Sequence, residues 1–151
     1  MNKEDLAIYE DARHWANLAM WSIDLQIKRL STGKFEISEF VMQPIADFHF
    51  LLTALTRLRE SALLVSQVSD LSAEIFEFDR NLPWLKRLRN VLEHITEYRV
   101  GDGRDKRVHK SSLQVFMSDS DHMEWLGERV EYDKCKLACS ALFKAIQARL
   151  K

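Results

Sequence analysis

PIADFHFLLTALTRLRESALLVSQ, residues 44–67, is the long and strongly apolar stretch that decides the fold of this chain. Pro44 suits the first turn of a helix, where a backbone N–H would lack an intrahelical partner, so the stretch predicts a helix of about 22 residues. Apolar side chains recur along it at helical spacing, namely Phe48, Leu51, Leu52, Leu55, Leu58 and Leu63. A helix with this much apolar surface is expected at the centre of a helical bundle.

His49 lies among these apolar residues, beside Asp47 and Phe50. A histidine in such surroundings more often packs in a core or an interface, with one ring nitrogen hydrogen-bonded, than takes part in a functional site. We therefore expect a core or interface position for His49 and keep a site role as the alternative.

Residues 2–30 contain no Gly or Pro and predict a long first helix, which Thr32 and Gly33 end. Its expected inner face holds Ile8, Ala12, Trp15, Ala19, Ile23 and Leu30. A second apolar row, made of Leu18, Trp21 and Leu25, widens this face beyond what one neighbouring helix can cover. We expect the first helix to contact two partners or another subunit.

Two more helices are predicted in the middle of the chain. The first covers residues 69–80, with Asp70 or Ser72 as its N-cap, and the second runs from about Pro83 to Val100. The expected buried residues are Leu71, Ile75, Phe76 and Phe78 in the first helix and Leu85, Leu88, Leu92 and Ile95 in the second.

The C-terminal part begins with residues 112–127, SLQVFMSDSDHMEWLG, in which two short apolar runs flank a polar turn at residues 118–121. This pattern predicts a β-hairpin. A last helix, capped by Asp133, is then expected to run to Leu150. Its inner face would hold Leu137, Ala141, Leu142, Ala145 and Ile146.

Composition agrees with this reading. With 46% hydrophobic and 30% charged residues, four Gly and two Pro, the 151-residue chain is too apolar for disorder and has too few breakers for a many-turned β protein. The fold class is predicted to be all-α: a bundle of four to five helices, with a short β-hairpin before the last helix, in a single domain of residues 1–151.

Net charge and the first residues bear on partners and location. The formal net charge of −1 provides no global field for nucleic acid or an anionic membrane, so such a partner would need a local patch. The first residues are acidic where a signal peptide would be basic, and no apolar run reaches about 18 residues. We expect a cytoplasmic protein without a membrane partner. Cys135 and Cys139 are expected to be buried, reduced thiols.

Residues 88–103, LRNVLEHITEYRVGDG, concentrate the polar residue types that carry chemistry. Residues four apart lie about 40° from one another on an α-helix, so these residues form two neighbouring polar stripes. The stripes are Asn90, His94 and Tyr98, and Arg89, Glu93 and Glu97. This stretch, in the middle of the predicted helix, is the candidate site.

Residues 101–110, GDGRDKRVHK, follow the candidate site and carry four basic and two acidic residues. They are expected to form a surface loop. One interpretation is a solvated charged loop; the other is a basic lip in which Arg104, Lys106 and Arg107 bind phosphate.

The sequence lacks the motifs of common metal sites, nucleotide-binding sites and serine hydrolases. The chain has no H-E-x-x-H or C-x-x-C spacing, no glycine-rich phosphate loop between a strand and a helix, and no G-x-S-x-G elbow. We expect no metal and no cofactor.

Arg89, Asn90 and His94 form an R-N-x-x-x-H pattern that resembles the R-x4-6-H signature of the HEPN superfamily. The resemblance implies an α-helical bundle that dimerises and cleaves RNA without a metal. In active members the histidine acts as general base or acid on the ribose 2′-hydroxyl, and the arginine stabilises the phosphate. Such a ribonuclease would belong to a toxin or defence system, with an antitoxin protein as a further partner.

The same residues allow other readings. Arg89 could pair with Glu93 and with Asp79 or Glu97 while His94 and Tyr98 pack against a neighbour. The motif could also hold a ligand or protein partner without catalysis, in a homodimeric binding or scaffolding module.

One toxin branch of the HEPN superfamily has a tyrosine two residues after the histidine, where this chain has Thr96. The modification known for that branch is therefore not carried over. The chain is also similar to a group of short uncharacterised bacterial proteins, which brings no activity with it.

Overall fold

The structure is a computed structural model that describes residues 2–32 and 42–151. This part of the chain is mostly helical, with a small antiparallel sheet before the last helix, which confirms the predicted fold class. Its elements are α1 (Lys3–Thr32), α2 (Met42–Val65), α3 (Ser72–Asn81), α4 (Leu85–Glu93), α5 (Ile95–Arg99), a 3-10 turn (Lys110–Ser112), β1 (Phe116–Ser118), β2 (His122–Trp125), β3 (Glu128–Glu131) and α6 (Tyr132–Arg149). The predicted position of Gly33 lies outside the described residues.

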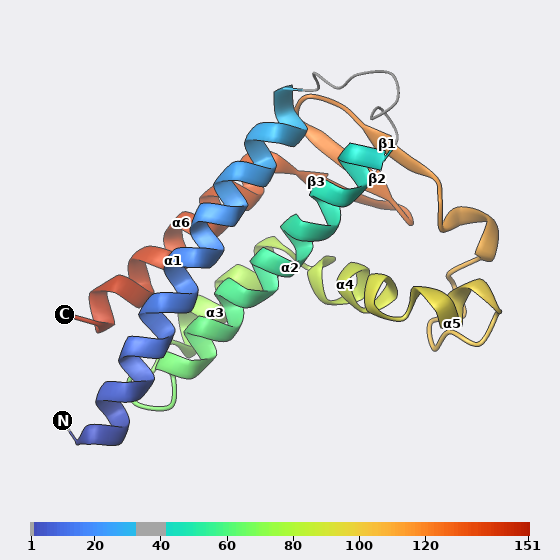
Figure 1. Cartoon of the computed structure of the whole chain (residues 1–151). Helices are drawn as coiled ribbons and strands as arrows, with labels where there is room; N and C mark the ends of the chain where they lie inside the picture. Colours follow the sequence, from blue (N-terminus) through green and yellow to red (C-terminus); the bar gives the residue numbers. More distant parts are fainter. Residues whose placement is uncertain (1, 33–41) are drawn as a thin grey trace.

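Helix α2 lies at the centre of the molecule, as its composition predicts, and contacts α1, α3, α4 and α6 (Figure 1). Its fully buried side chains include Phe48, Leu51, Leu52, Leu55 and Leu58. The prediction was wrong for Leu63, which is 39% exposed because it borders a cavity between α2 and α4. His49 is exposed beside Phe50, so it does not lie in the core of the chain, and an interface position for it stays a prediction.

Helix α1 runs antiparallel to α2 and packs along most of its length (Figure 1). Small buried residues, Ala12, Ala16 and Ala19, let the two helices approach closely. Trp15 was predicted to be buried, but it is 43% exposed and lies under the guanidinium of Arg57 from α2, 5.1 Å from the ring centroid. It therefore belongs to the edge of the α1–α2 pair rather than to the core.

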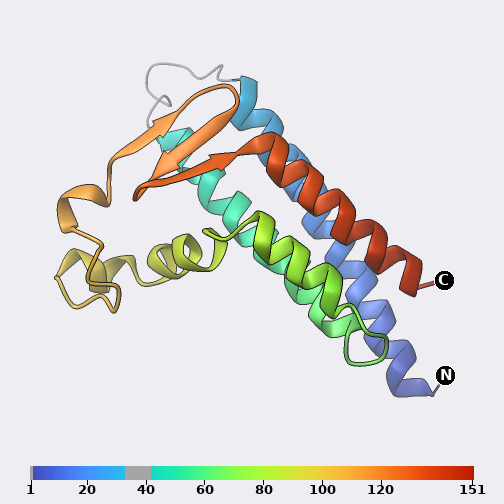
Figure 2. The ribbon, with the colours of Figure 1, turned by 180° about the vertical axis from the view of Figure 1, so that it is seen from behind.

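Helices α3 and α6 cover the other side of α2 and lie side by side (Figure 2). In α3 the expected Ile75 and Phe78 are buried, but Phe76 is 67% exposed. The N-cap of α3 is Leu71 and not the predicted Asp70 or Ser72, although Asp70 accepts the N–H of Ser72 at 2.9 Å.

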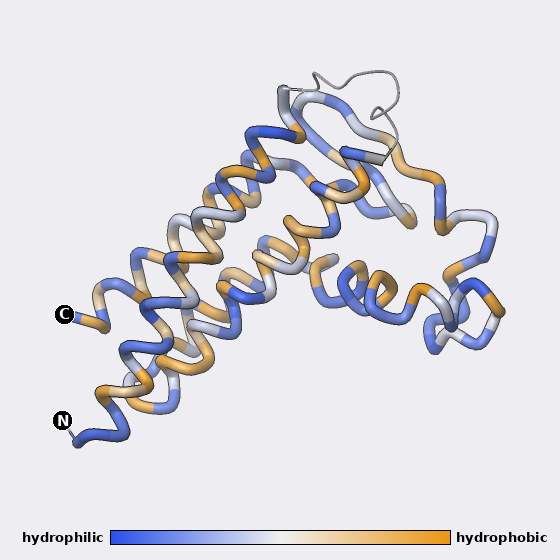
Figure 3. Tube along the Cα trace, viewed as in Figure 1, coloured by the Kyte–Doolittle hydropathy of each residue, from blue (hydrophilic) through white to orange (hydrophobic). Residues whose placement is uncertain are grey.

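The inner face of α6 was predicted only in part: Leu142 and Ile146 are buried as expected, but Leu137 and Ala141 are not. Leu137 was expected inside but is 73% exposed, and Ala141 is exposed too. The buried row is Tyr132, Cys135, Ala138, Cys139, Leu142 and Ile146, so orange and blue segments alternate along this helix in Figure 3. Both cysteines are free thiols, as predicted, and burial raises the pKa of Cys135 to about 12.

The predicted hairpin is confirmed and gains a further strand. β1 pairs with β2 in antiparallel register, with Ser118 opposite Met123, and β3 continues the sheet on the other edge of β2. Trp125 stacks on Phe116 at 5.0 Å and meets the ring of Phe48 edge-on, which docks the sheet on the start of α2. Among the described residues, no helix combines the length and apolar composition that crossing a bilayer requires.

Candidate functional site

The motif residues lie on an arm, formed by α4 and α5, that projects from the bundle (Figures 1 and 2). Leu85, Leu88 and Val91 bury one side of α4 against the core, which leaves Arg89 and Asn90 on the outer side. The single helix predicted from Pro83 to Val100 was wrong, because the chain breaks at His94, with φ −110° and ψ 28°.

The break at His94 keeps its backbone hydrogen bonds. His94 donates its N–H to the carbonyl of Asn90 at 3.1 Å, and Tyr98 donates to the carbonyl of His94 at 3.2 Å. The first predicted stripe, Asn90, His94 and Tyr98, therefore still borders one cavity across the break, whereas only Glu97 of the second stripe lines that cavity.

Arg89 forms an ion pair within its own helix. Its Nη2 lies 2.6 Å from Oε1 of Glu93, and both side chains remain partly exposed. Arg89 lines a cavity of about 520 Å3 between α2 and α4. Asp79, the other carboxylate considered for Arg89, instead holds Arg59 through two hydrogen bonds of 2.6 and 2.7 Å.

His94 lines a different and smaller cavity, of about 140 Å3, at the junction of α4, α5 and the following loop. Five of the predicted site residues surround it: Asn90, His94, Glu97, Tyr98 and Arg104. The Nδ1 atom of His94 lies 3.2 Å from Oε1 of Glu97, and about half of each side chain is exposed. Within one chain, Arg89 and His94 therefore do not share a cavity, although Asn90 borders both.

Tyr98 is buried and fixes the loop that follows α5. Its hydroxyl accepts the N–H of Asp105 at 3.1 Å, and Gly103 packs directly against its ring. An alanine Cβ at position 103 would overlap that ring, which explains the glycine. Tyr98 thus sets the position of Arg104, which lies between these two contacts.

The residues of the predicted basic lip, Arg104, Lys106 and Arg107, do not line one common cavity. Arg107 binds the carboxylate of Asp105 with Nε and Nη2, each at 2.9 Å, and lines a separate cavity of about 410 Å3 beside the sheet. Lys106 is exposed. Arg104 is exposed too, and its guanidinium has no hydrogen bond or ion pair with any residue that the structure describes.

Sequence reasoning missed the ion-pair network under the arm. Arg87 binds Asp105 through Nε at 3.0 Å, and its Nη1 reaches the Leu126 carbonyl at 3.0 Å and Glu128 at 3.2 Å. Hydrogen bonds from Arg107 and Arg87 hold the pKa of Asp105 well below its usual range. Because these partners lie up to 41 residues apart, no local pattern could have indicated the network.

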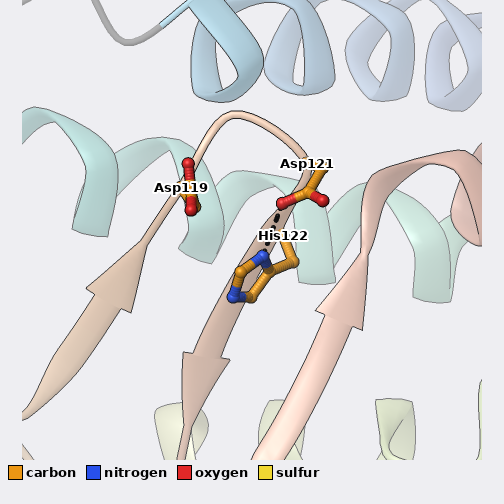
Figure 4. Close-up of side chains that lie close together, drawn as sticks. All are labelled: Asp119, Asp121 and His122. Atoms are coloured by element: carbon orange, nitrogen blue, oxygen red, sulfur yellow. Dashed lines mark hydrogen bonds and ion pairs between the residues drawn. The ribbon is translucent and has the colours of Figure 1, made fainter.

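A second cluster of titratable residues lies at the turn between β1 and β2. Figure 4 shows Asp119, Asp121 and His122, whose possible ligand atoms lie within 4.8 Å of one another. His122 is already engaged, because Nδ1 contacts Asp121 at 2.6 Å and Nε2 lies 3.3 Å from Arg129. A metal ion would have to replace these partners, so in this structure the cluster is an ion-pair group.

Comparison with protein-family models, curated proteins and solved structures finds no match to this chain.

Proposed function

We infer that this chain is a HEPN-like protein that cleaves RNA without a metal ion, with His94 as the group that transfers the proton. The supporting observation is the pair of His94 and Glu97 at the edge of a cavity. A carboxylate that binds Nδ1 of a histidine orients the ring and leaves Nε2 as the basic nitrogen. Such a ribonuclease would act in a toxin or defence system, with an antitoxin as its protein partner.

The proposed reaction uses the ribose itself as nucleophile. Nε2 of His94 accepts the proton of a 2′-hydroxyl, and the 2′-oxygen attacks the adjacent phosphorus. The bond from phosphorus to the 5′-oxygen breaks, the 5′-oxygen takes a proton from solvent, and a 2′,3′-cyclic phosphate is left. A nearby cation stabilises the negative charge that builds up on the phosphate.

The test is RNA cleavage by purified protein in EDTA, with His94→Ala compared with the wild type. General acid–base catalysis contributes about 100-fold or more, so the variant should lose at least that much rate. His14→Ala, which removes an exposed histidine on α1, serves as the matched control and should cleave normally. An unchanged rate for His94→Ala would overturn the proposal.

The second candidate is a homodimeric binding or scaffolding module, and the exposed surface of α1 favours it. Trp15, Leu18, Trp21 and Leu25 are 36 to 69% exposed. Arg57 of α2 covers Trp15. Phe50 lies seven residues, or about two turns, before Arg57 on the same side of α2, so Phe50 extends the exposed apolar surface of α1. We name these five residues the α1 face.

The α1 face has the size and charge pattern for a second copy of the chain. Its aromatic and leucine side chains offer on the order of 500 Å2, and their polar surroundings can supply the rest of the roughly 800 Å2 per partner in a standard interface. In an antiparallel, two-fold arrangement, Glu10 and Asp11 of one copy meet Lys28 and Arg29 of the other, where Arg29 also binds Asp47 of its own chain through Nε at 3.0 Å. A dimer in solution is the expected result, and a monomer at high protein concentration would contradict it.

A further inference from the structure

We propose that the cavity beside His94 is a phosphate-binding site complete within one chain, and that Arg104 rather than Arg89 supplies its positive charge. The proposal rests on the proposed function for the identity of the ligand, a phosphodiester of RNA. It assigns the role of the motif arginine to a residue ten positions beyond His94.

Arg104 and Arg89 line different cavities, and only one of these cavities includes His94. Arg104 and His94 line the same cavity, together with Asn90, Glu97 and Tyr98. Arg89 lines the larger cavity on the other side of Asn90. A phosphate in the cavity beside His94 would therefore share that cavity with Arg104, whereas Arg89 lines the other one.

The cavity beside His94 is large enough for a phosphate group. Its 140 Å3 is roughly ten times the 10–15 Å3 that a single buried water needs. This space holds a phosphate group with its five heavy atoms, while sugar and base would lie outside against the exposed arm. The Asn90 amide and the Arg104 guanidinium are donors that can bind phosphate oxygens at the edge of this space.

The arginines near the candidate site differ in whether a carboxylate binds them. Arg107 is bound by both oxygens of Asp105, and Arg89 is bound by Glu93. Arg104 has no such partner among the described residues, so its donors remain available to an anion. The Arg89–Glu93 pair is partly exposed and therefore weak, so the location of Arg89 matters more than its pairing.

The backbone on both sides of Arg104 is held in place by contacts with Tyr98. Gly103 packs on the Tyr98 ring, and the N–H of Asp105 donates to the Tyr98 hydroxyl. The carboxylate of Asp105 is held in turn by Arg87 and Arg107. A binding residue flanked by two fixed residues loses less conformational freedom when it binds.

The first experiment measures binding without catalysis. Inorganic phosphate is titrated into the full chain while the His94 ring signals are followed by NMR. A saturable shift is expected in the wild type, with an affinity reduced roughly tenfold or more in Arg104→Ala, because a charge-assisted hydrogen bond is removed. Arg89→Ala should bind as the wild type does.

Arg99→Ala is the matched control, because Arg99 is an exposed arginine on α5 outside the cavity lining. It should leave the phosphate affinity unchanged. The proposal is overturned if the wild type shows no response of His94 to phosphate, or if Arg89→Ala rather than Arg104→Ala weakens binding.

RNA cleavage by the same variants separates this proposal from the proposed function. Phosphate binding that depends on Arg104, without cleavage of RNA, would support the site and reject the ribonuclease. Cleavage that is lost in His94→Ala but normal in Arg104→Ala would support the ribonuclease and reject the role of Arg104.

Discussion

Gly103 illustrates how one residue positions the candidate site. Its backbone touches the Tyr98 ring, and this contact sets the path of the chain into Arg104 and Asp105. A side chain at position 103 would push the ring or the loop away. The requirement for glycine here is steric, and it depends on a contact between α5 and the loop that follows it.

Gly103→Ala should therefore destabilise the loop by about 1–3 kcal/mol, as overpacking does elsewhere. Hydrogen exchange at the Asp105 amide, which donates to Tyr98, is the sensitive measurement. Gly127→Ala is a useful comparison, because position 127 has space for a Cβ and only its φ of 78° is unfavourable, at a cost of about 1 kcal/mol. Unchanged exchange at Asp105 in Gly103→Ala would contradict the packing described.

At the scale of elements, Arg87 joins three parts of the structure that are distant in sequence. It lies on α4, and its partners lie in the loop after α5, in the β2–β3 turn and at the start of β3. Asp105 binds both Arg87 and Arg107, and Arg87 connects the arm to the sheet through the Leu126 carbonyl and Glu128.

This network predicts a particular response to acid. The pKa of Asp105 is lower in the folded state than in the unfolded chain, so its contribution to the free energy of unfolding is complete above the unfolded pKa of about 3.9. That contribution is lost as the pH falls through the lower, folded pKa. Asp105→Asn should therefore be less stable than the wild type at neutral pH, and the difference should shrink below about pH 4. Urea unfolding at several pH values checks this; a constant difference would rule it out.

The whole molecule is an antiparallel pair of long helices, backed by α3 and α6, with the sheet at one end and the α4–α5 arm to one side (Figures 1 and 2). The α1 face lies on the open side of the α1–α2 pair. Burial by a second copy would remove these apolar side chains from water.

Trp21→Glu should shift a dimer to monomers, because it places a charge in the α1 face. Phe76→Glu is the matched control: Phe76 on α3 is 67% exposed and Trp21 is 69% exposed, but Phe76 lies outside that face. Sedimentation of both variants measures the difference. Loss of the dimer in Phe76→Glu alone would assign the interface to α3 instead.

Much of the fold could be predicted because it follows from local pattern. The apolar spacing from Phe48 to Leu58 decided which side of α2 is buried, and the polar turn at residues 118–121 indicated the hairpin. The predictions of burial were wrong where tertiary contacts determine which side chains are buried. Leu63 borders a cavity, and Leu137 faces outward because the row from Cys135 to Ile146 meets the core instead.

The candidate site divides in the same way between sequence and tertiary structure. The sequence by itself determined an all-α chain with Arg89, Asn90 and His94 on one polar segment, because residue type and helical spacing are local properties. Only the tertiary structure decided that Arg104 lines the same cavity as His94 while Arg89 lines another. The physical reason is the packing of Gly103 on the Tyr98 ring, which depends on how the chain turns back after α5.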